Sequence, residues 1–339
     1  MKEIPDKKRK QELGSFYTDR KIVEFIFDIL SIWKDDEDKK KKRWQSHEGS
    51  PHFPSVIDPA VGEGAFLKVA LEKNFTNQNH IFGLDIDPDA VNKWPDTHLL
   101  SSFDNKMSVL KVHFLRQNGL DKIHWEQHKK YYESHLKKSD VSNQQFDAVV
   151  GNPPYGGSGL EFNQLRDTLI QNIRNFELLP KSVRDNLKHS NSQSSLGFYQ
   201  DDKKDKLSSE ARAKLKSFPI EVLFIERFVQ LVKPGGWIAI VIPDGILANS
   251  NMHNVREFIA KKTKVNAIVS LPRDSFKNVG TNAKTSILFL QKLKKDADLN
   301  KDLDYPVFLA SISNIEQNNF EILLKSYKNF FEKGVLNDK

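Results

Sequence analysis

Short apolar strands alternate with helical stretches along most of this chain, and this alternation limits its fold more than any other feature. Strands are predicted at residues 56–58, 81–85, 123–126, 146–150, 237–242, 267–271 and 286–290. Strands separated by helices pair mostly in parallel and are covered by helices on both faces. The sequence therefore predicts an α/β fold with a doubly wound, mostly parallel sheet. Ligands of such sheets lie at the carboxyl ends of the strands.

A glycine turn follows the first of these strands, in the run Asp58-Pro59-Ala60-Val61-Gly62-Glu63-Gly64. Glycine has no Cβ atom, so the backbone here can bend sharply and let a ligand lie against it. One helix and one strand later, Asp85 stands where doubly wound sheets hold ribose hydroxyls. A dinucleotide is less consistent with this turn, because Leu67 stands where the third glycine of the dinucleotide fingerprint is expected. The two motifs predict a site for a nucleoside without a pyrophosphate.

Gly151 and the stiff tetrapeptide Asn152-Pro153-Pro154-Tyr155 follow the predicted strand at 146–150. Proline has no backbone N–H and keeps the preceding residue extended, so the segment is rich in acceptors. The Asn152 amide oxygen and the Pro153 carbonyl can accept both N–H groups of a planar amine. The ring of Tyr155 can stack on the heterocycle that carries this amine. An ordinary turn after a strand is the alternative interpretation.

These motifs, in this order, resemble those of S-adenosylmethionine-dependent N6-adenine DNA methyltransferases of the gamma arrangement. Further similarity lies in residues 14–18, 233–237 and 270–290. Within the last of these, residues 276–280 and 284–290 are most similar to methylation subunits of type I restriction-modification systems and their relatives. One difference is Asp19, which follows Thr18 where the family commonly has proline. The resemblance implies the cofactor S-adenosyl-L-methionine and methyl transfer to the N6 amine of adenine in DNA. The implied catalytic motif is Asn152, Pro153, Pro154 and Tyr155.

The resemblance also assigns residues to the cofactor and to the target base. Tyr17 and Thr18 are similar to an N-terminal element that covers the methionine end of the cofactor. The complete cofactor set is Tyr17, Thr18, Asp58, Pro59, Ala60, Gly62, Gly64, Phe66, Asp85, Ile86, Glu126 and Asn152. Glu126 is either an acceptor for the cofactor's adenine amine or a plain surface acid. Phe276 is expected to pack against the target base, with a place in the apolar core beside Pro272 as the alternative.

Composition agrees with a nucleic-acid partner without identifying one. The formal net charge is +7 and the pI is about 9.2, which suits a polyanion such as DNA. The chain has no cysteine, which excludes disulfides and thiolate zinc sites, and its histidines lack metal-ligand spacing, so no metal is expected. No apolar run is long enough to span a membrane, and residues 1–10 are charged without a following apolar stretch. A cytoplasmic location is therefore expected.

Three parts of the chain are expected: a helical segment at 1–50 with the cofactor-covering element, a catalytic domain at 51–290, and a linker, strand and helix at 291–339. Helices are predicted at 21–33, 221–232 and 320–331, a strand near 307–309, and a solvated loop in the charge run 34–43. The catalytic domain contains a polar insertion at about 156–218, expected to be a lid or a DNA-contacting arm, with a disordered spacer as the alternative. Its expected phosphate contacts are Lys181, Arg184, Lys188 and Lys203.

Other functions stay open at this stage. The Asn-Pro-Pro-Tyr motif also occurs in methyltransferases for RNA bases and for glutamine side chains, and cytosine N4 is a further acceptor. A non-catalytic DNA-binding subunit is the alternative from another class. Residues 291–339 are too short for a target-recognition domain. The sequence therefore predicts that a specificity subunit or a further domain reads the DNA sequence, and a nuclease subunit is a further candidate partner.

Overall fold

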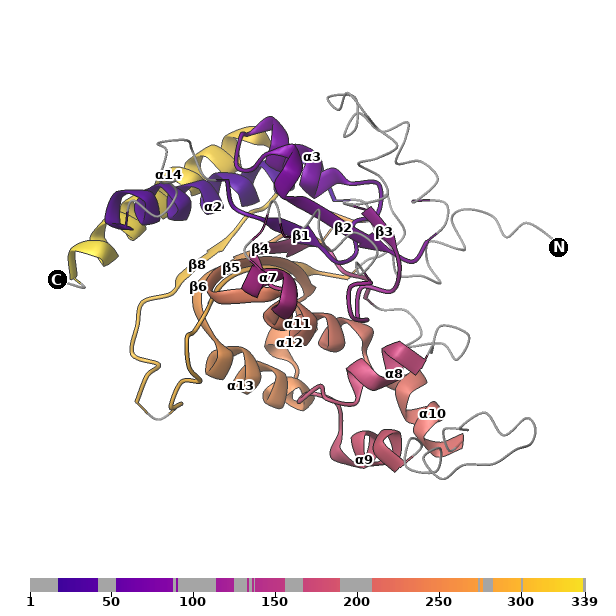
Figure 1. Ribbon diagram of the computed structural model, residues 1–339. Helices are drawn as coiled ribbons and strands as arrows, with labels where there is room; N and C mark the ends of the chain where they lie inside the picture. The colour runs from indigo at the N-terminus through magenta and orange to yellow at the C-terminus, as the bar shows by residue number, and fades with distance from the viewer. Residues whose placement is uncertain are drawn as a thin grey trace, which may run out of the picture.

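The computed structural model describes residues 18–41, 53–87, 90, 114–124, 133, 136, 138–155, 167–189, 209–273, 275–276, 283–299 and 301–337. Within these residues eight strands form one sheet (Figure 1). The strands are β1 (Val56–Asp58), β2 (Ile81–Asp85), β3 (Phe114–Arg116), β4 (Phe146–Gly151), β5 (Val232–Pro243), β6 (Thr263–Ser270), β7 (Thr285–Lys292) and β8 (Phe308–Ser311). The helices are α2 (Arg20–Lys41), α3 (Ala65–Glu72), η1 (Gln78–His80), α7 (Lys138–Asn143), α8 (Asp167–Ile173), α9 (Lys181–His189), α10 (Ser209–Ser217), α11 (Ile220–Leu231), α12 (Gly245–Ala248), η5 (Ser250–Met252), α13 (His253–Lys262) and α14 (Gln317–Asn337).

The strand order is β3-β2-β1-β4-β5-β7-β6-β8. Strands β1 to β5 are parallel, β7 runs antiparallel to both β5 and β6, and β8 is parallel to β6. The chain builds outward from β1 to β3 and then returns to place β4 on the other side of β1. Such a reversal of strand order is where doubly wound sheets bind ligands. The predicted fold class, an α/β fold with a doubly wound, mostly parallel sheet, is confirmed.

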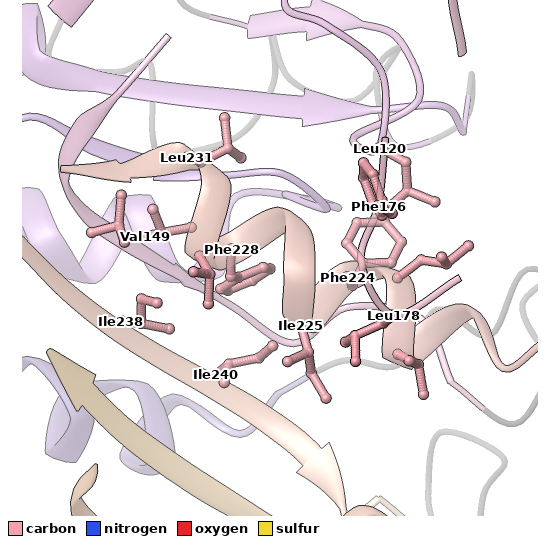
Figure 2. Packing of buried hydrophobic residues seen from close by; sticks show 14 of the residues in the cluster. Leu120, Val149, Phe176, Leu178, Phe224, Ile225, Phe228, Leu231, Ile238 and Ile240 are labelled. Carbon is pink, nitrogen blue, oxygen red and sulfur yellow. The ribbon is translucent and has the colours of Figure 1, made fainter. Parts of the chain in front are cut away.

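Two apolar clusters hold the helices to the two faces of the sheet. Residues of β5 alternate between them: Ile238 and Ile240 pack with α11 and α13, whereas Trp237 and Ala239 pack with α2, α3 and α14. Figure 1 shows α2, α3 and α14 along one face and α11, α12 and α13 along the other. Figure 2 shows the side chains of α11, including Phe228, packed between β4, β5 and the segment that carries Phe176. The sheet is therefore covered on both faces, as its apolar strands require.

Two predicted elements are wrong. The predicted third strand at 123–126 is not one at residues 123 and 124, and Phe114–Arg116 forms β3 instead. The side chain of Gln144 takes the place of a strand partner, because its Oε1 accepts from the Ile123 N–H at 2.9 Å and its Nε2 donates to the Ile123 carbonyl at 2.9 Å. The charge run predicted as a loop continues α2 to Lys41. Lys and Glu are good helix formers, and the run contains no Gly or Pro to stop the helix.

The residues after β7 extend the sheet and cover part of it. The strand and helix predicted at 307–309 and 320–331 are present as β8 and α14. Strand β8 pairs with β6, and α14 packs against α2. At this contact the Trp33 indole Nε1 donates to the Tyr327 hydroxyl at 2.6 Å in a buried position. The C-terminal part of the described chain thus covers the same core as the first helix.

Residues 167–189, which belong to the insertion predicted at about 156–218, pack on the core through α11. The side chains of Ile173, Phe176, Leu178 and Leu187 are buried in the same cluster as β4 and β5. The Glu226 carboxylate of α11 accepts the backbone N–H groups of residues 177 and 178 at 2.6 and 2.8 Å. Burial, partly offset by these bonds, raises the pKa of Glu226 to about 6. Helix α11 ends where β5 begins, at the amino edge of the sheet. The rest of the helix, with this anchor, therefore extends toward the carboxyl edge.

Candidate functional site

The predicted site residues gather at the carboxyl edge of the parallel strands. Asp58 ends β1, Asp85 ends β2, and Asn152 follows β4. Because β1 pairs with β2 on one side and β4 on the other, these three positions lie on adjacent strands. The structure therefore brings the glycine turn, the acid of β2 and the Asn-Pro-Pro-Tyr motif together at the point where the strand order reverses.

The glycine turn is held to the end of β2 by backbone and side-chain bonds. The Val61 N–H donates to the Leu84 carbonyl at 2.9 Å, and the Gly62 N–H donates to Asp85 Oδ2 at 2.7 Å. Gly62 has φ +52°, and a Cβ atom built there would meet no heavy atom within 4 Å. The backbone conformation, rather than crowding, thus favours glycine. This leaves open space against the turn, as a bound ligand requires.

Asp85 is a half-buried carboxylate directed at this turn. Its Oδ1 accepts from the Asp87 N–H at 2.8 Å, while its Oδ2 accepts from Gly62. Burial raises the pKa of Asp85 to about 6, although hydrogen bonds from the backbone of Asp87 and Gly62 partly oppose the shift. Ile86, the next residue, is 37% exposed. An acceptor for hydroxyl groups and an apolar side chain therefore stand side by side.

Asp58 lies between the glycine turn and the strand that carries Asn152. Its side chain is 1% exposed, and its Oδ1 accepts from the Ala60 N–H at 3.0 Å. Burial, with a smaller contribution from the charge of Asp85, raises the pKa of Asp58 to about 8. A Cβ atom on Gly151 would lie 2.6 Å from Asp58 Oδ1. The carboxylate of the turn thus touches the backbone just before Asn152.

The Asn152 amide contacts the N-terminal part of the chain. Its Nδ2 donates to Thr18 Oγ1 at 3.1 Å. Tyr155 is 1% exposed, and its ring meets the fully buried ring of Phe276 edge to face, with centroids 6.4 Å apart and planes at 86°. Burial also raises the pKa of the Tyr155 hydroxyl. The structure thus places Thr18, Asn152, Tyr155 and Phe276 in one connected group.

Some of the remaining predicted residues are described by the structure, and others lie outside the described residues. Pro59 and Pro153 are buried at the edge, and Phe66 packs into the core from α3. Gly64 precedes α3 with φ 89°. Tyr17, Glu126 and Lys203 lie outside the described residues, as does the side chain of Lys188.

A polar cluster at the same edge was not predicted from the sequence. Ser286 Oγ donates to Asp244 Oδ1 at 2.7 Å, and Lys284 Nζ lies 3.5 Å from Asp244 Oδ2. Asp244 directly follows β5, just as Asp85 ends β2 and Asn152 follows β4. The position of an acid immediately after an apolar strand is the signal that could have identified it.

The residues at this edge are consistent with S-adenosylmethionine, the cofactor that the resemblance of the sequence motifs implies. Asp85 supplies an acceptor for ribose hydroxyls, Ile86 an apolar contact, and the turn at Gly62 leaves room against the backbone. Among the described residues no group of His, Asp and Glu side chains could hold a metal ion. The helices of the described chain include none long and apolar enough to cross a membrane.

Comparisons with known proteins agree with the motifs. Residues 190–333 match the N-6 DNA Methylase family model, and residues 79–182 match the Eco57I restriction-modification methylase model. A curated relative, the type I restriction enzyme MjaIX methylase subunit of Methanocaldococcus jannaschii, is 22% identical over 289 residues, which are 84% of this chain and 38% of that subunit. The chain spans less than half the length of the curated relatives it matches.

Solved structures show the same fold at low identity. A Listeria monocytogenes protein described as a class I S-adenosylmethionine-dependent methyltransferase superposes with a TM-score of 0.54 at 20% identity, covering 93% of this chain and 71% of that one. The M protein of the type I restriction enzyme EcoKI superposes with a TM-score of 0.53 at 16% identity, covering 92% and 53%. The predicted resemblance is confirmed: the chain is similar to N6-adenine DNA methyltransferases and to the methylation subunits of type I restriction-modification enzymes.

Proposed function

We propose that this chain transfers a methyl group from S-adenosylmethionine to the N6 amine of adenine in DNA, as the catalytic part of a restriction-modification or related system. The observation that carries the proposal is the contact between Asp58 of the glycine turn and the backbone just before the Asn-Pro-Pro-Tyr motif. Asp58 Oδ1 lies against the backbone of Gly151, and Asn152 follows directly. A nucleoside held by Asp85 and an amine held by Asn152 would therefore meet at one sheet edge.

On the cofactor side, the chain would bind S-adenosylmethionine and orient its methyl group. The bound cofactor supplies an electrophilic methyl group on a sulfonium, which is already an activated donor. Asp85 would accept the ribose hydroxyls, and Ile86 would pack against the adenine ring. The backbone around Ala60 and Gly62 would lie under the rest of the cofactor. These contacts fix the donor's position, which is the main requirement for a transfer that needs no metal or covalent enzyme intermediate.

On the target side, the chain presents acceptors to the amine. Asn152 Oδ1 and the Pro153 carbonyl would accept the two N6–H groups, so that the nitrogen lone pair points toward the donor. Because the donor is activated, no strong base is required before attack, and the proton leaves to solvent after transfer. A duplex hides N6, so the base must first leave the stack at a cost of about a few kcal/mol.

Binding of the target base would also require the groups around Tyr155 to move. Tyr155 and Phe276 are 1% and 0% exposed, so a base can stack on either ring only after the groups that cover them separate. Tyr155 is the proposed stacking partner, and Phe276 the proposed second aromatic contact. Binding of the flipped base therefore includes an opening step around these two rings.

We further propose that a partner subunit or another domain reads the DNA sequence. The residues after β7 extend the sheet as β8 and cover α2 as α14, so the described part of this segment has a structural role. Sequence readout requires an element in a groove, whereas phosphate contacts carry no sequence information. The exposed Lys181 on α9 and Lys216 in the last turn of α10 are candidates for such phosphate contacts.

The test is transfer of labelled methyl from S-adenosylmethionine to DNA, RNA and protein, with the wild-type chain and Asn152→Ala compared. Digestion of the product and mass spectrometry identify the modified base. We expect N6-methyladenine in DNA from the wild type alone. N4-methylcytosine, methylated RNA or methylated protein would each refute the proposed acceptor. If neither the chain nor its mixture with the partner subunits transfers methyl, the catalytic role is refuted.

A further inference from the structure

The side-chain amide of Asn152 can face its target in two ways. A carboxamide carries an acceptor oxygen on one side and a donor NH₂ on the other, and its terminal torsion has a broad, roughly two-fold preference. Only the orientation with Oδ1 forward can accept an N–H of an amine. The opposite orientation would place donors against donors. Catalysis by this motif therefore requires something that fixes the direction of the amide.

Thr18 is placed to do this. Its Oγ1 accepts from Asn152 Nδ2 at 3.1 Å, across 134 positions of the sequence. With Nδ2 held by the hydroxyl oxygen, the carbonyl end of the amide points the other way. The Asn152 side chain also hydrogen-bonds with Tyr155 of its own motif, so the contact with Thr18 ties the amide in addition to a part of the chain far away in sequence.

The position of Thr18 is itself fixed by the start of α2. Asp19 caps this helix: its Oδ1 accepts from the Lys21 N–H at 2.8 Å, and its carbonyl accepts from the Ile22 N–H at 3.1 Å. The side chains of Ile22, Val23 and Ile26 behind it are 0% exposed. Thr18 therefore stands on a capped helix anchored in the core, and not on a free terminus.

We propose that Thr18 is a positioning residue for the target amine, whose hydroxyl holds the Asn152 amide with Oδ1 toward the substrate. This inference rests on the proposed function of Asn152. It differs from an exclusive role of Thr18 in covering the cofactor, because it acts on the residue that binds the other substrate. A hydroxyl at position 18 is then required for fast transfer even when the cofactor site is full.

The first test measures the amide itself, without substrate or cofactor. The Asn152 side-chain NH₂ resonances, assigned by their loss in Asn152→Asp, are followed by hydrogen exchange in the whole chain. Exchange should be slowed in the wild type and in Thr18→Ser, and should be faster by about fivefold or more in Thr18→Val, the factor for a bond worth about 1 kcal/mol. Equal exchange in the wild type and Thr18→Val would overturn the proposal. This result does not depend on which substrate is methylated.

The second test measures single-turnover methyl transfer at saturating cofactor and DNA. Thr18→Val should be slower by about fivefold or more, and Thr18→Ser should restore most of the rate. A Thr18→Val defect that disappears once cofactor saturates would assign the residue to the cofactor alone and overturn the proposal. If the wild type transfers no methyl but the exchange result holds, the proposed function fails while the amide contact stands.

The chain offers a matched control in Thr285. Thr285 is 0% exposed at the start of β7, and its hydroxyl makes no hydrogen bond with the described residues. Thr285→Val makes the same chemical change, and we expect it to leave both the exchange of Asn152 and the transfer rate as in the wild type. Thermal unfolding of all variants shows whether a loss of rate follows a loss of structure. A Thr285→Val defect equal to that of Thr18→Val would overturn the assignment.

Discussion

The affinity for S-adenosylmethionine should depend on pH through Asp85. Burial raises the pKa of this carboxyl to about 6 from its usual 3.8. Ribose hydroxyls donate hydrogen bonds, so they bind the ionised carboxylate and compete with its proton. A group with a pKa of about 6 is about nine-tenths protonated at pH 5, which should weaken the cofactor about tenfold, or about 1.4 kcal/mol, relative to pH 7.5.

The direction of this pH dependence follows from the linkage between cofactor binding and the ionisation of Asp85. Cofactor binding favours the ionised form and therefore lowers the pKa of Asp85, so protons are released and affinity rises as pH increases through about 6. At pH 6 about half a proton should leave per cofactor bound. In the unbound fold the same raised pKa acts in the opposite direction, because the folded chain holds a proton that the unfolded chain has lost. Asp85 thus stabilises the fold less as pH rises from about 4 to 6.

Isothermal titration calorimetry from pH 5 to 7.5, in buffers of different ionisation enthalpy, measures both the affinity and the proton release. The matched variant is Asp85→Asn, which keeps the size of the side chain and cannot titrate. It should bind more weakly at pH 7.5 by about 1.5–3 kcal/mol and lose the pH dependence in this range. A wild-type affinity that is flat from pH 5 to 7, or the same dependence in Asp85→Asn, would refute the reasoning.

Three further changes test the site and the fold. Asn152→Ala should lower single-turnover methyl transfer more than tenfold while calorimetry shows cofactor affinity within about twofold, because the lost bond belongs to the target amine. Gly151→Ala should cost about 1–3 kcal/mol in denaturant unfolding, since its Cβ would lie 2.6 Å from Asp58 Oδ1 at φ +154°; unchanged stability would contradict this contact. Tyr327→Phe should cost about 1–3 kcal/mol, because the Trp33 indole N–H would lose its buried acceptor; a cost near zero would show that α14 is held by packing alone.

The sheet could be predicted because most of its strands carry continuous apolar runs. Strand β4, for example, is buried along its whole length and was predicted almost to its ends. Strand β3 was missed because it has three residues with only Phe114 buried, whereas the more apolar Ile123 is satisfied by a glutamine side chain. Short edge strands depend on their partner, and a single sequence does not identify the partner.

The candidate site residues that local patterns predict are those that directly follow the predicted strands. Asp85 and Asn152 could be found in this way. The cluster of Asp244 with Ser286 depends on the antiparallel register of β5 and β7, which pairs Ile242 with Ser286. The contact between Thr18 and Asn152 likewise depends on how α2 packs on the sheet. Both are tertiary contacts between distant parts of the chain. A local pattern can single out Asp244 as an acid after an apolar strand, but it does not identify the partner of either residue.

The strand order itself sets the distance over which the two substrates must meet. Asp85 and Asn152 lie at the ends of β2 and β4, with β1 between them. Two interstrand spacings separate these ends by about 10 Å. A cofactor whose ribose contacts Asp85 must therefore extend across the end of β1 to present its methyl group near Asn152, and the open turn at Gly62 lies on that path. Because Asp58 of β1 contacts both the turn and the backbone of Gly151, the proposed donor and acceptor positions are linked through one residue. Positioning of this kind can supply a large part of the rate of a transfer whose donor is already activated.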